Sequence, residues 1–96
     1  MSDNKVFEPV GTQLNISLAS ANVNVDEQLD SGIDAFVVMV SGGAAEYRMD
    51  GGDPTSTTNL VLAVDNPVFV RDRGTWQMVF KQASGVTLVI QPGRMV

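Results

Sequence analysis

The chain contains neither cysteine nor histidine. Without cysteine it has no disulfide and no thiolate nucleophile, and without histidine it lacks the commonest general base and the commonest metal ligand. The usual hydrolytic triads and the usual zinc sites therefore cannot be assembled. We accordingly expect a protein that is not an enzyme, with no catalytic residue, no bound metal and no cofactor.

Basic residues are also scarce. Six Lys and Arg against eleven Asp and Glu give a formal net charge of −5 at pH 7. Nucleic acids and anionic membranes attract proteins through Lys and Arg, so this composition argues against both as partners. No apolar run approaches the roughly 20 residues of a membrane-spanning helix, and residues 1–5 lack the features of a signal peptide. We expect one soluble domain, made in the cytosol.

Patterns typical of β-strands fill most of the chain. Residues 13–18 alternate apolar and polar side chains, as a half-buried strand does, whereas residues 35–40 are apolar throughout and predict a strand covered on both faces. Further strands are expected at 21–25, 46–49, 60–64, 68–71, 75–81 and 86–90. About eight short strands predict an all-β fold, an antiparallel β-sandwich of jelly-roll or immunoglobulin-like topology.

The two ends of the chain do not follow this pattern. Residues 1–12 predict an N-terminal arm, and the apolar Phe7 within it indicates that the arm docks on its own domain or on a neighbour. Pro92 and Gly93 predict the end of the last strand, which leaves residues 92–96 as a C-terminal tail. The β-sandwich domain is thus expected to span residues 13–91.

An acidic segment interrupts the strands at residues 26–34. It contains Asp26, Glu27, Asp30 and Asp34, and it favours at most one helical turn. A calcium loop is one interpretation, but the spacing of the carboxylates differs from the alternating ligands of an EF-hand. The simpler interpretation is a solvated acidic loop.

The segment Tyr47-Arg48-Met49-Asp50-Gly51-Gly52-Asp53-Pro54-Thr55 predicts a strand that runs into a sharp turn. Asp bonds the backbone that follows it, Gly accepts a positive φ, and Pro cannot donate to a strand ladder. An acid–base pair of Asp50 and Asp53 is the alternative, but aspartate is common in such turns for backbone reasons. We expect the turn to be shaped by Tyr47, Arg48, Asp50, Gly51, Pro54 and Thr55.

Apolar residues exceed what a small sandwich can enclose. They make up 44% of the chain, and three expected strands are apolar on both faces. Some of these side chains must face outward, and large exposed apolar patches mark interaction surfaces. We therefore expect a homo-oligomer or a subunit of a larger assembly, with candidate interface residues Val6, Phe7, Phe36, Val38, Leu62, Trp76 and Arg94.

Two smaller features have competing interpretations. Trp76 alternates in phase with Met78 and Phe80, which indicates a core or interface anchor, and stacking on a sugar is the alternative. The basic residues of 71–73 indicate a charged hairpin tip, and a grip on an acidic partner is the alternative.

The turn at 47–55 resembles the Y-R-x-D-G-x-x-P-T segment of small β-sandwich virion proteins of tailed bacteriophages. The similarity extends to residues 21–25, 35–40 and 88–93. The turn also resembles the Y-x-x-D-G-x-x-P-T turn of the C-terminal immunoglobulin-like modules of chitobiase-type enzymes.

The phage resemblance implies a non-catalytic virion structural protein. Such a capsid decoration or cement protein would bind the phage head through contacts with the major capsid protein and with copies of itself. It would reside in the virion, assembled in the host cytoplasm. A head–tail connector or tail component is one alternative, and an immunoglobulin-like carbohydrate-binding module that stacks sugars on Tyr47 and Trp76 is another.

Overall fold

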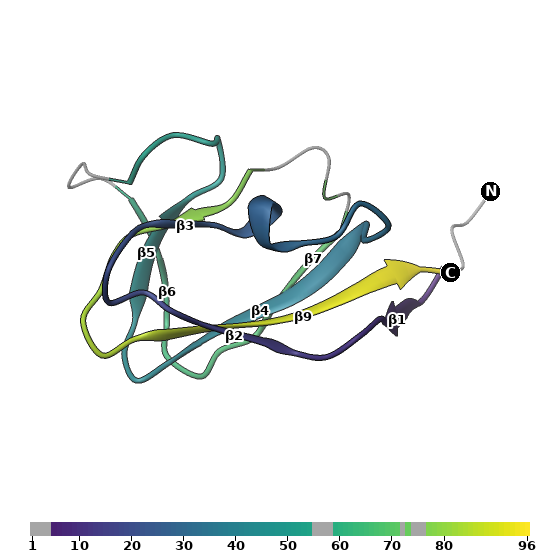
Figure 1. Ribbon diagram of the computed structural model, residues 1–96, viewed down its shortest axis with the longest axis horizontal. Coiled ribbons are helices and arrows are strands. Elements are labelled where there is room, and N and C mark those ends of the chain that lie inside the picture. The colour runs from purple at the N-terminus through teal and green to yellow at the C-terminus, as the bar shows by residue number, and fades with distance from the viewer. Residues whose placement is uncertain (1–4, 55–58, 72, 74–76) are drawn as a thin grey trace.

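The computed structural model describes residues 5–54, 59–71, 73 and 77–96. Within them the chain forms strands and one short 3₁₀ helix (Figure 1). In chain order these are β1 (Phe7–Pro9), β2 (Leu14–Ser17), β3 (Val23–Asn24), η1 (Val25–Gln28), β4 (Ala35–Ser41), β5 (Ala45–Arg48), β6 (Leu60–Leu62), β7 (Val68–Val70), β8 (Val79–Phe80) and β9 (Thr87–Met95).

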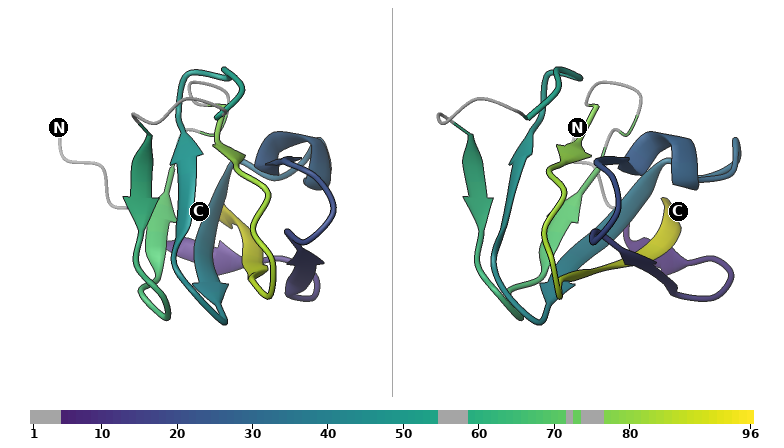
Figure 2. Two further views of the ribbon diagram at one scale, coloured as in Figure 1. Left: turned by 90° about the vertical axis from the view of Figure 1, so that its left-hand side faces the viewer. Right: turned by 60° about the vertical axis from the view of Figure 1, so that its left-hand side comes forward.

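The strands form two antiparallel sheets that pack as two layers (Figure 2). Sheet A has the order β1-β9-β4-β7, with β2 also paired to β9, and sheet B has the order β3-β8-β5-β6. The all-β sandwich expected from the sequence is thus confirmed. The strand pairs are nested along the chain, as in one long hairpin that has been rolled up: β5·β6 lies inside β4·β7, which lies inside β3·β8, which lies inside β2·β9. This is the jelly-roll order, since an immunoglobulin-like sandwich would place its first, second, fifth and fourth strands in one sheet.

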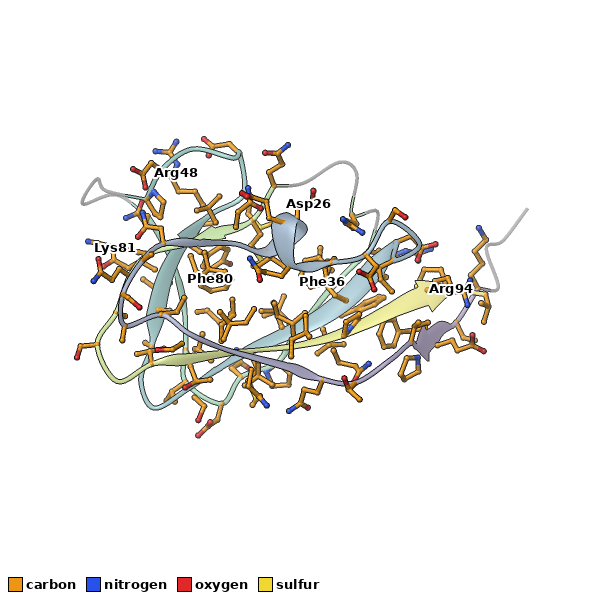
Figure 3. All side chains as sticks on the ribbon, viewed as in Figure 1. Asp26, Phe36, Arg48, Phe80, Lys81 and Arg94 are labelled. Carbon is orange, nitrogen blue, oxygen red and sulfur yellow. The ribbon has the colours of Figure 1, made fainter. Side chains whose placement is uncertain are left out.

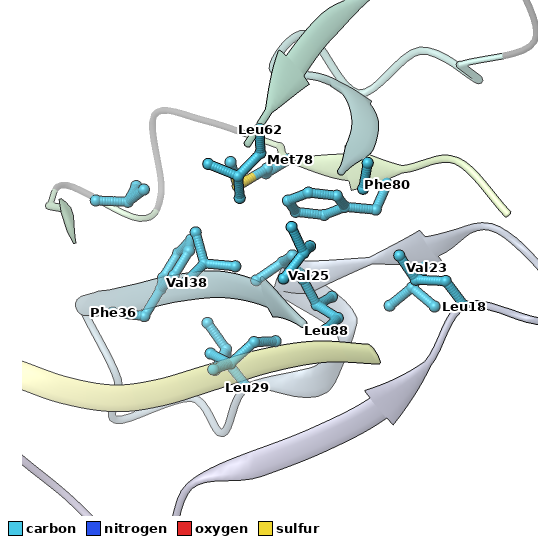
Figure 4. Close-up of a cluster of buried hydrophobic side chains, with 14 of the residues drawn as sticks. Leu18, Val23, Val25, Leu29, Phe36, Val38, Leu62, Met78, Phe80 and Leu88 are labelled. Atoms are coloured by element: carbon cyan, nitrogen blue, oxygen red, sulfur yellow. The ribbon is translucent and has the colours of Figure 1, made fainter. Parts of the chain in front are cut away.

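The core lies between the two sheets and is built from alternate residues of each strand. On β4 the side chains of Phe36, Val38 and Val40 point inward, and on β9 those of Leu88 and Ile90 do so. Figure 4 shows inward side chains of sheet A, such as Val38 and Leu88, facing those of sheet B, such as Met78 and Phe80. The buried cluster consists of Leu18, Val23, Val25, Leu29, Ile33, Phe36, Val38, Val40, Ala45, Leu62, Val70, Met78, Phe80, Val86, Leu88 and Ile90.

Strand β9 continues through Pro92, so the predicted end of the last strand at Pro92 and Gly93 is wrong. Its first half pairs with β2 and its second half pairs with β1. Residues 10–13 detour between these two pairings and oppose only residues 91 and 92. The carbonyl of Pro92 accepts from the Val10 N–H at 2.9 Å, so it points toward residues 10–13. In an antiparallel strand the nitrogen and the carbonyl of one residue point to the same side, so the proline nitrogen, which has no hydrogen to donate, also faces residues 10–13 and not β4. The ladder to β4 is therefore intact.

The N-terminal arm docks on its own domain as strand β1. The Phe7 ring lies across Gly93, where any Cβ would overlap it. It reaches Phe69 of β7, with ring centroids 5.4 Å apart and planes at 75°, an edge-to-face contact. At the far end Val6 and Val96 exchange two backbone hydrogen bonds of 2.8 and 2.9 Å. The expected arm and tail are thus paired with each other, and residues 92–95 belong to β9.

Candidate interaction surface

Sheet A carries apolar side chains on the face that points away from the core. Strand neighbours alternate between faces, so Val37 and Met39 of β4 point outward because Phe36 and Val38 point inward. The register places outward residues of neighbouring strands beside them. We define the apolar outer face as Phe7, Val37, Met39, Phe69, Val89 and Met95, none of which belongs to the buried cluster.

The apolar outer face contains no charged side chain. Val37 lies between Phe69 of β7 and Gln91 of β9, and Met39 lies beside Val89. The other outward residues on the ladders of β2, β4 and β9 are small or neutral: Ala35, Ser41, Asn15, Ser17, Thr87, Gln91 and Gly93. Five members of the face are half-buried by one another, whereas the Phe69 side chain is 46% exposed.

Sheet B has a charged outer surface by contrast. Glu46 and Arg48 of β5 point away from the core, and Figure 3 shows Arg48 and Lys81 at the periphery while Phe36 and Phe80 point into the interior. Lys81 lies 3.7 Å from the Glu46 carboxylate, and Arg48 lies 2.5 Å from Asp50. Charged side chains of this sheet thus find partners within the chain.

Three candidate interface residues are wrong. Phe36, Val38 and Leu62 are 3%, 0% and 3% exposed, and they fill the interior between the sheets. No neighbour can reach them in the folded chain. The physical reason is that successive side chains of a strand point to opposite faces. When both sets of alternating side chains are apolar, the sequence pattern does not say which set points into the core.

The other candidate interface residues have different positions. Phe7 belongs to the apolar outer face, Val6 is 62% exposed beside it in the chain, and Arg94 is exposed near the C-terminal end of β9 (Figure 3). Trp76 lies outside the described residues. Sequence reasoning missed Val37, Met39, Phe69, Val89 and Met95. For the first four the only signal was an apolar run on both strand faces, and Met95 lay in the predicted tail.

A second set of exposed apolar side chains lies along β6, the edge strand of sheet B, with Val61 on the outer side beside Glu46 and Leu60 on the inner side beside Tyr47. Leu60, Val61 and Val64 are 53%, 65% and 46% exposed, and only Leu62 of this stretch is buried. We call these three residues the β6 patch. Edge strands with apolar side chains are prone to contact other chains, because their outer backbone groups lack a strand partner.

The turn that follows β5 is held by contacts among its own residues and by hydrogen bonds with Gln77 and Asn22. Gly51 has φ of +79° and donates its N–H to the Gln77 carbonyl at 3.0 Å. Asp50 accepts from the Gly52 N–H at 2.9 Å and pairs with Arg48, whose hydrogen bond lowers the pKa of the Asp50 carboxyl to about 2. Asp53 instead accepts from the Asn22 amide.

Of the other residues predicted to shape the turn, two pack within the fold and one lies outside the described residues. Tyr47 stacks on Phe80, with ring centroids 5.2 Å apart and planes at 29°. Pro54 is fully buried, and Thr55 lies outside the described residues. The described members of the turn set are therefore engaged in contacts within the fold.

The acidic loop holds a cation supplied by the chain itself. Arg73 donates to the Asp26 carboxylate at 2.6 Å. The same guanidinium also donates to the backbone carbonyls of Asp26, Leu29, Asp30 and Ile33. The one helical turn that the sequence allowed in this segment is present as η1, which begins one residue earlier, at Val25. In the described part of the chain no cluster of three or more acidic side chains is arranged to hold a metal ion.

Comparison of the chain with known families, with curated proteins and with solved structures found no match. No helix among the described residues is long and apolar enough to cross a membrane. What the protein does is therefore inferred from its own surfaces.

Proposed function

We propose that the chain is a non-catalytic virion structural protein, a capsid decoration or cement protein that binds a phage head. The apolar outer face is the observation that carries this proposal. A sandwich whose sheet is apolar on its outer side is stable in water only at some cost, and such faces are typical of subunits that are covered by neighbours. The resemblance of the 47–55 turn to phage virion proteins supplies the kind of assembly.

The β6 patch adds a second contact surface on a different sheet. A decoration protein in this scheme touches both the shell and other copies of itself, and two separate apolar surfaces on one small domain suit that requirement. Each contact is small, and association costs offset part of its apolar burial. Many copies on one shell would act together, because a subunit held by one contact makes the next contact at high effective concentration.

The jelly-roll order is compatible with this proposal and does not carry it. Viral capsid domains and lectins both use the fold, and function must be argued from surfaces rather than from topology. For sugar binding the described residues offer little: Tyr47 is engaged with Phe80, and the groove between β5 and β7 is lined mainly by apolar side chains. We therefore favour assembly over carbohydrate binding.

The test uses heads of the phage that encodes the chain, purified without this protein. We expect the added chain to co-sediment with the heads and to appear as ordered density on their exterior by electron cryomicroscopy. The double variant Val61→Asp/Val64→Asp should bind heads at least tenfold more weakly, because it places charges in the β6 patch. Ser84→Asp, in an exposed turn between β8 and β9, is the matched control and should bind normally.

Absence of the chain from mature particles, together with no binding to heads, would contradict the proposal. Density at the head–tail junction instead of the shell would replace decoration by the connector alternative. Titration with oligosaccharides, followed by tryptophan fluorescence, should give no saturable change, and a saturable change would favour the carbohydrate-binding alternative.

A further inference from the structure

We propose that the apolar outer face of sheet A binds a second copy of this chain, forming a two-fold dimer with Gln91 near the axis. The inference deepens the proposed function, on which it rests, by naming the partner of one surface. It leaves the β6 patch free for the shell. Three features of the face point to a second copy.

The first feature is charge. The chain carries a formal net charge of −5, so two copies repel each other over most orientations. The outward residues on the ladders of β2, β4, β7 and β9 include no carboxylate. Two acidic chains can meet here without bringing like charges together.

The second feature is the position and chemistry of Gln91. It pairs with Val37 in the β4·β9 ladder, and Val89 precedes it on the same face of β9. Its Nε2 donates to its own Pro92 carbonyl at 2.8 Å. The amide still has a second N–H and the lone pairs of Oε1. An amide is its own complement, so two Gln91 side chains related by a two-fold axis can satisfy each other, as an isologous contact requires.

The third feature is size. The seven residues of β4 and the four-strand width of sheet A give a flat footprint of roughly 440 Å², using ~3.3 Å per residue and ~4.8 Å per strand. A standard interface covers about 800 Å² per partner. We therefore expect a reversible, concentration-dependent dimer rather than a permanent one. Two sheets stacked face to face at a separation of about 10 Å are a common packing.

The test begins with sedimentation equilibrium of the unmodified chain from micromolar to millimolar concentration. We expect a monomer–dimer equilibrium that tightens, or stays constant, when NaCl rises from 50 to 500 mM, because salt screens the repulsion between acidic copies. A chain that remains monomeric at millimolar concentration overturns the proposal. Dimers that dissociate as salt rises also overturn it, because charge pairs would then hold them.

Single cysteines locate the contact, since the chain has none of its own. Gln91→Cys should form a disulfide-linked dimer under mild oxidation at a protein concentration where the dimer is populated, because a residue near a two-fold axis lies beside its own copy. Val61→Cys, which places its thiol on the β6 patch, should form no disulfide-linked dimer under the same conditions. Equal cross-linking of both variants, or of Val61→Cys alone, contradicts an interface at sheet A.

Val37→Asp should abolish the dimer at every concentration up to millimolar, a loss of at least 100-fold in affinity, while circular dichroism confirms the fold. If this variant unfolds, Gln91→Glu replaces it with a side chain of nearly the same shape. Two carboxylates would then face each other, so the Gln91→Glu dimer should be lost at pH 7 and regained near pH 4. Unchanged dimerisation of both variants overturns the proposal.

The outcomes for dimer and shell are separable. A dimer that fails to bind heads contradicts the proposed function and keeps this inference. A monomer that binds heads contradicts this inference and keeps the proposed function. If Val37 and Val89 are then shielded from solvent on the head, the apolar outer face binds a shell protein.

Discussion

The outer faces of the two sheets differ in kind. Sheet B exposes Glu46, Arg48 and Lys81, which pair within the chain, whereas sheet A exposes Val37 and Met39 among other uncharged side chains. Both sheets share one interior and similar inward residues. The difference shows that the fold needs only one face of each sheet to be apolar, and the second apolar face of sheet A is the basis of the proposed contact with another chain.

The assignment of inner and outer faces is tested most directly on β4, where inward and outward residues are neighbours in the chain. Val38→Asp buries an unpaired carboxylate between the sheets, at a position that is fully buried. We expect a loss of about 4 kcal/mol or more in the free energy of unfolding, enough to leave much of the chain unfolded. Urea denaturation followed by circular dichroism measures this.

The matched change is Val37→Asp, one residue away on the outer face. It should alter the stability of the monomer by less than about 1 kcal/mol, since at this half-exposed position the new carboxylate can still reach water. Equal destabilisation by the two variants would mean that the assigned faces of β4 are incorrect.

The next largest effect concerns the cation inside the acidic loop. Arg73→Ala removes the donor of the Asp26 carboxylate and of four backbone carbonyls. We expect a loss of about 2–3 kcal/mol, because partly buried acceptors lose a charged donor. Arg73→Lys should recover only part of it, since an ammonium cannot match the planar fork of a guanidinium. Full recovery by lysine in thermal unfolding would show that charge alone matters.

A smaller effect tests how β1 completes the outer face of sheet A. Gly93→Ala should cost about 1–3 kcal/mol, because the new Cβ would overlap the Phe7 ring. In the double variant Phe7→Ala/Gly93→Ala the overlap with the ring is absent and only that with the Glu8 carbonyl remains, so the two changes should cost less together than the sum of their separate costs. Strictly additive unfolding free energies from the double-mutant cycle would rule out the proposed contact.

The smallest effect lies on the charged side, in the ion pair of Arg48 and Asp50. The folded pKa of Asp50, about 2, lies below its ordinary value, so the pair stabilises the fold above about pH 4. That contribution is lost as the pH falls through 2, and it is small because both groups are solvated. In Arg48→Ala the pKa of Asp50, followed by NMR, should rise toward its ordinary value. An unchanged pKa would assign the shift to the Gly52 N–H instead.

The fold class followed from local patterns in the sequence, and so did several turns. Alternation in residues 13–18 predicted β2, and Asp50-Gly51 predicted a turn that the positive φ of Gly51 confirms. The end of β9 could not be predicted this way. Pro92 interrupts an ordinary strand, and it is accommodated here only because residues 10–13, about 80 positions earlier in the chain, detour opposite it.

The existence of surplus apolar side chains could be predicted from the sequence, but which residues carry them to the surface could not. An excess of apolar residues was visible in composition, yet Phe36 and Val38 were chosen where Val37 and Met39 face outward. Arg73 was expected at a hairpin tip, and its partners in the acidic loop lie forty or more residues away in sequence. Contacts of that separation leave no local signal.

The sequence by itself determined that this chain is a two-layer β protein with more apolar side chains than one interior can enclose. Period-two patterns and turn residues act over a few neighbours, so they can be read without a structure. Only the tertiary structure decided which alternate side chains of β4 and β9 face the core. That choice depends on which face of sheet A packs against sheet B, and therefore on pairings between strands far apart in the chain.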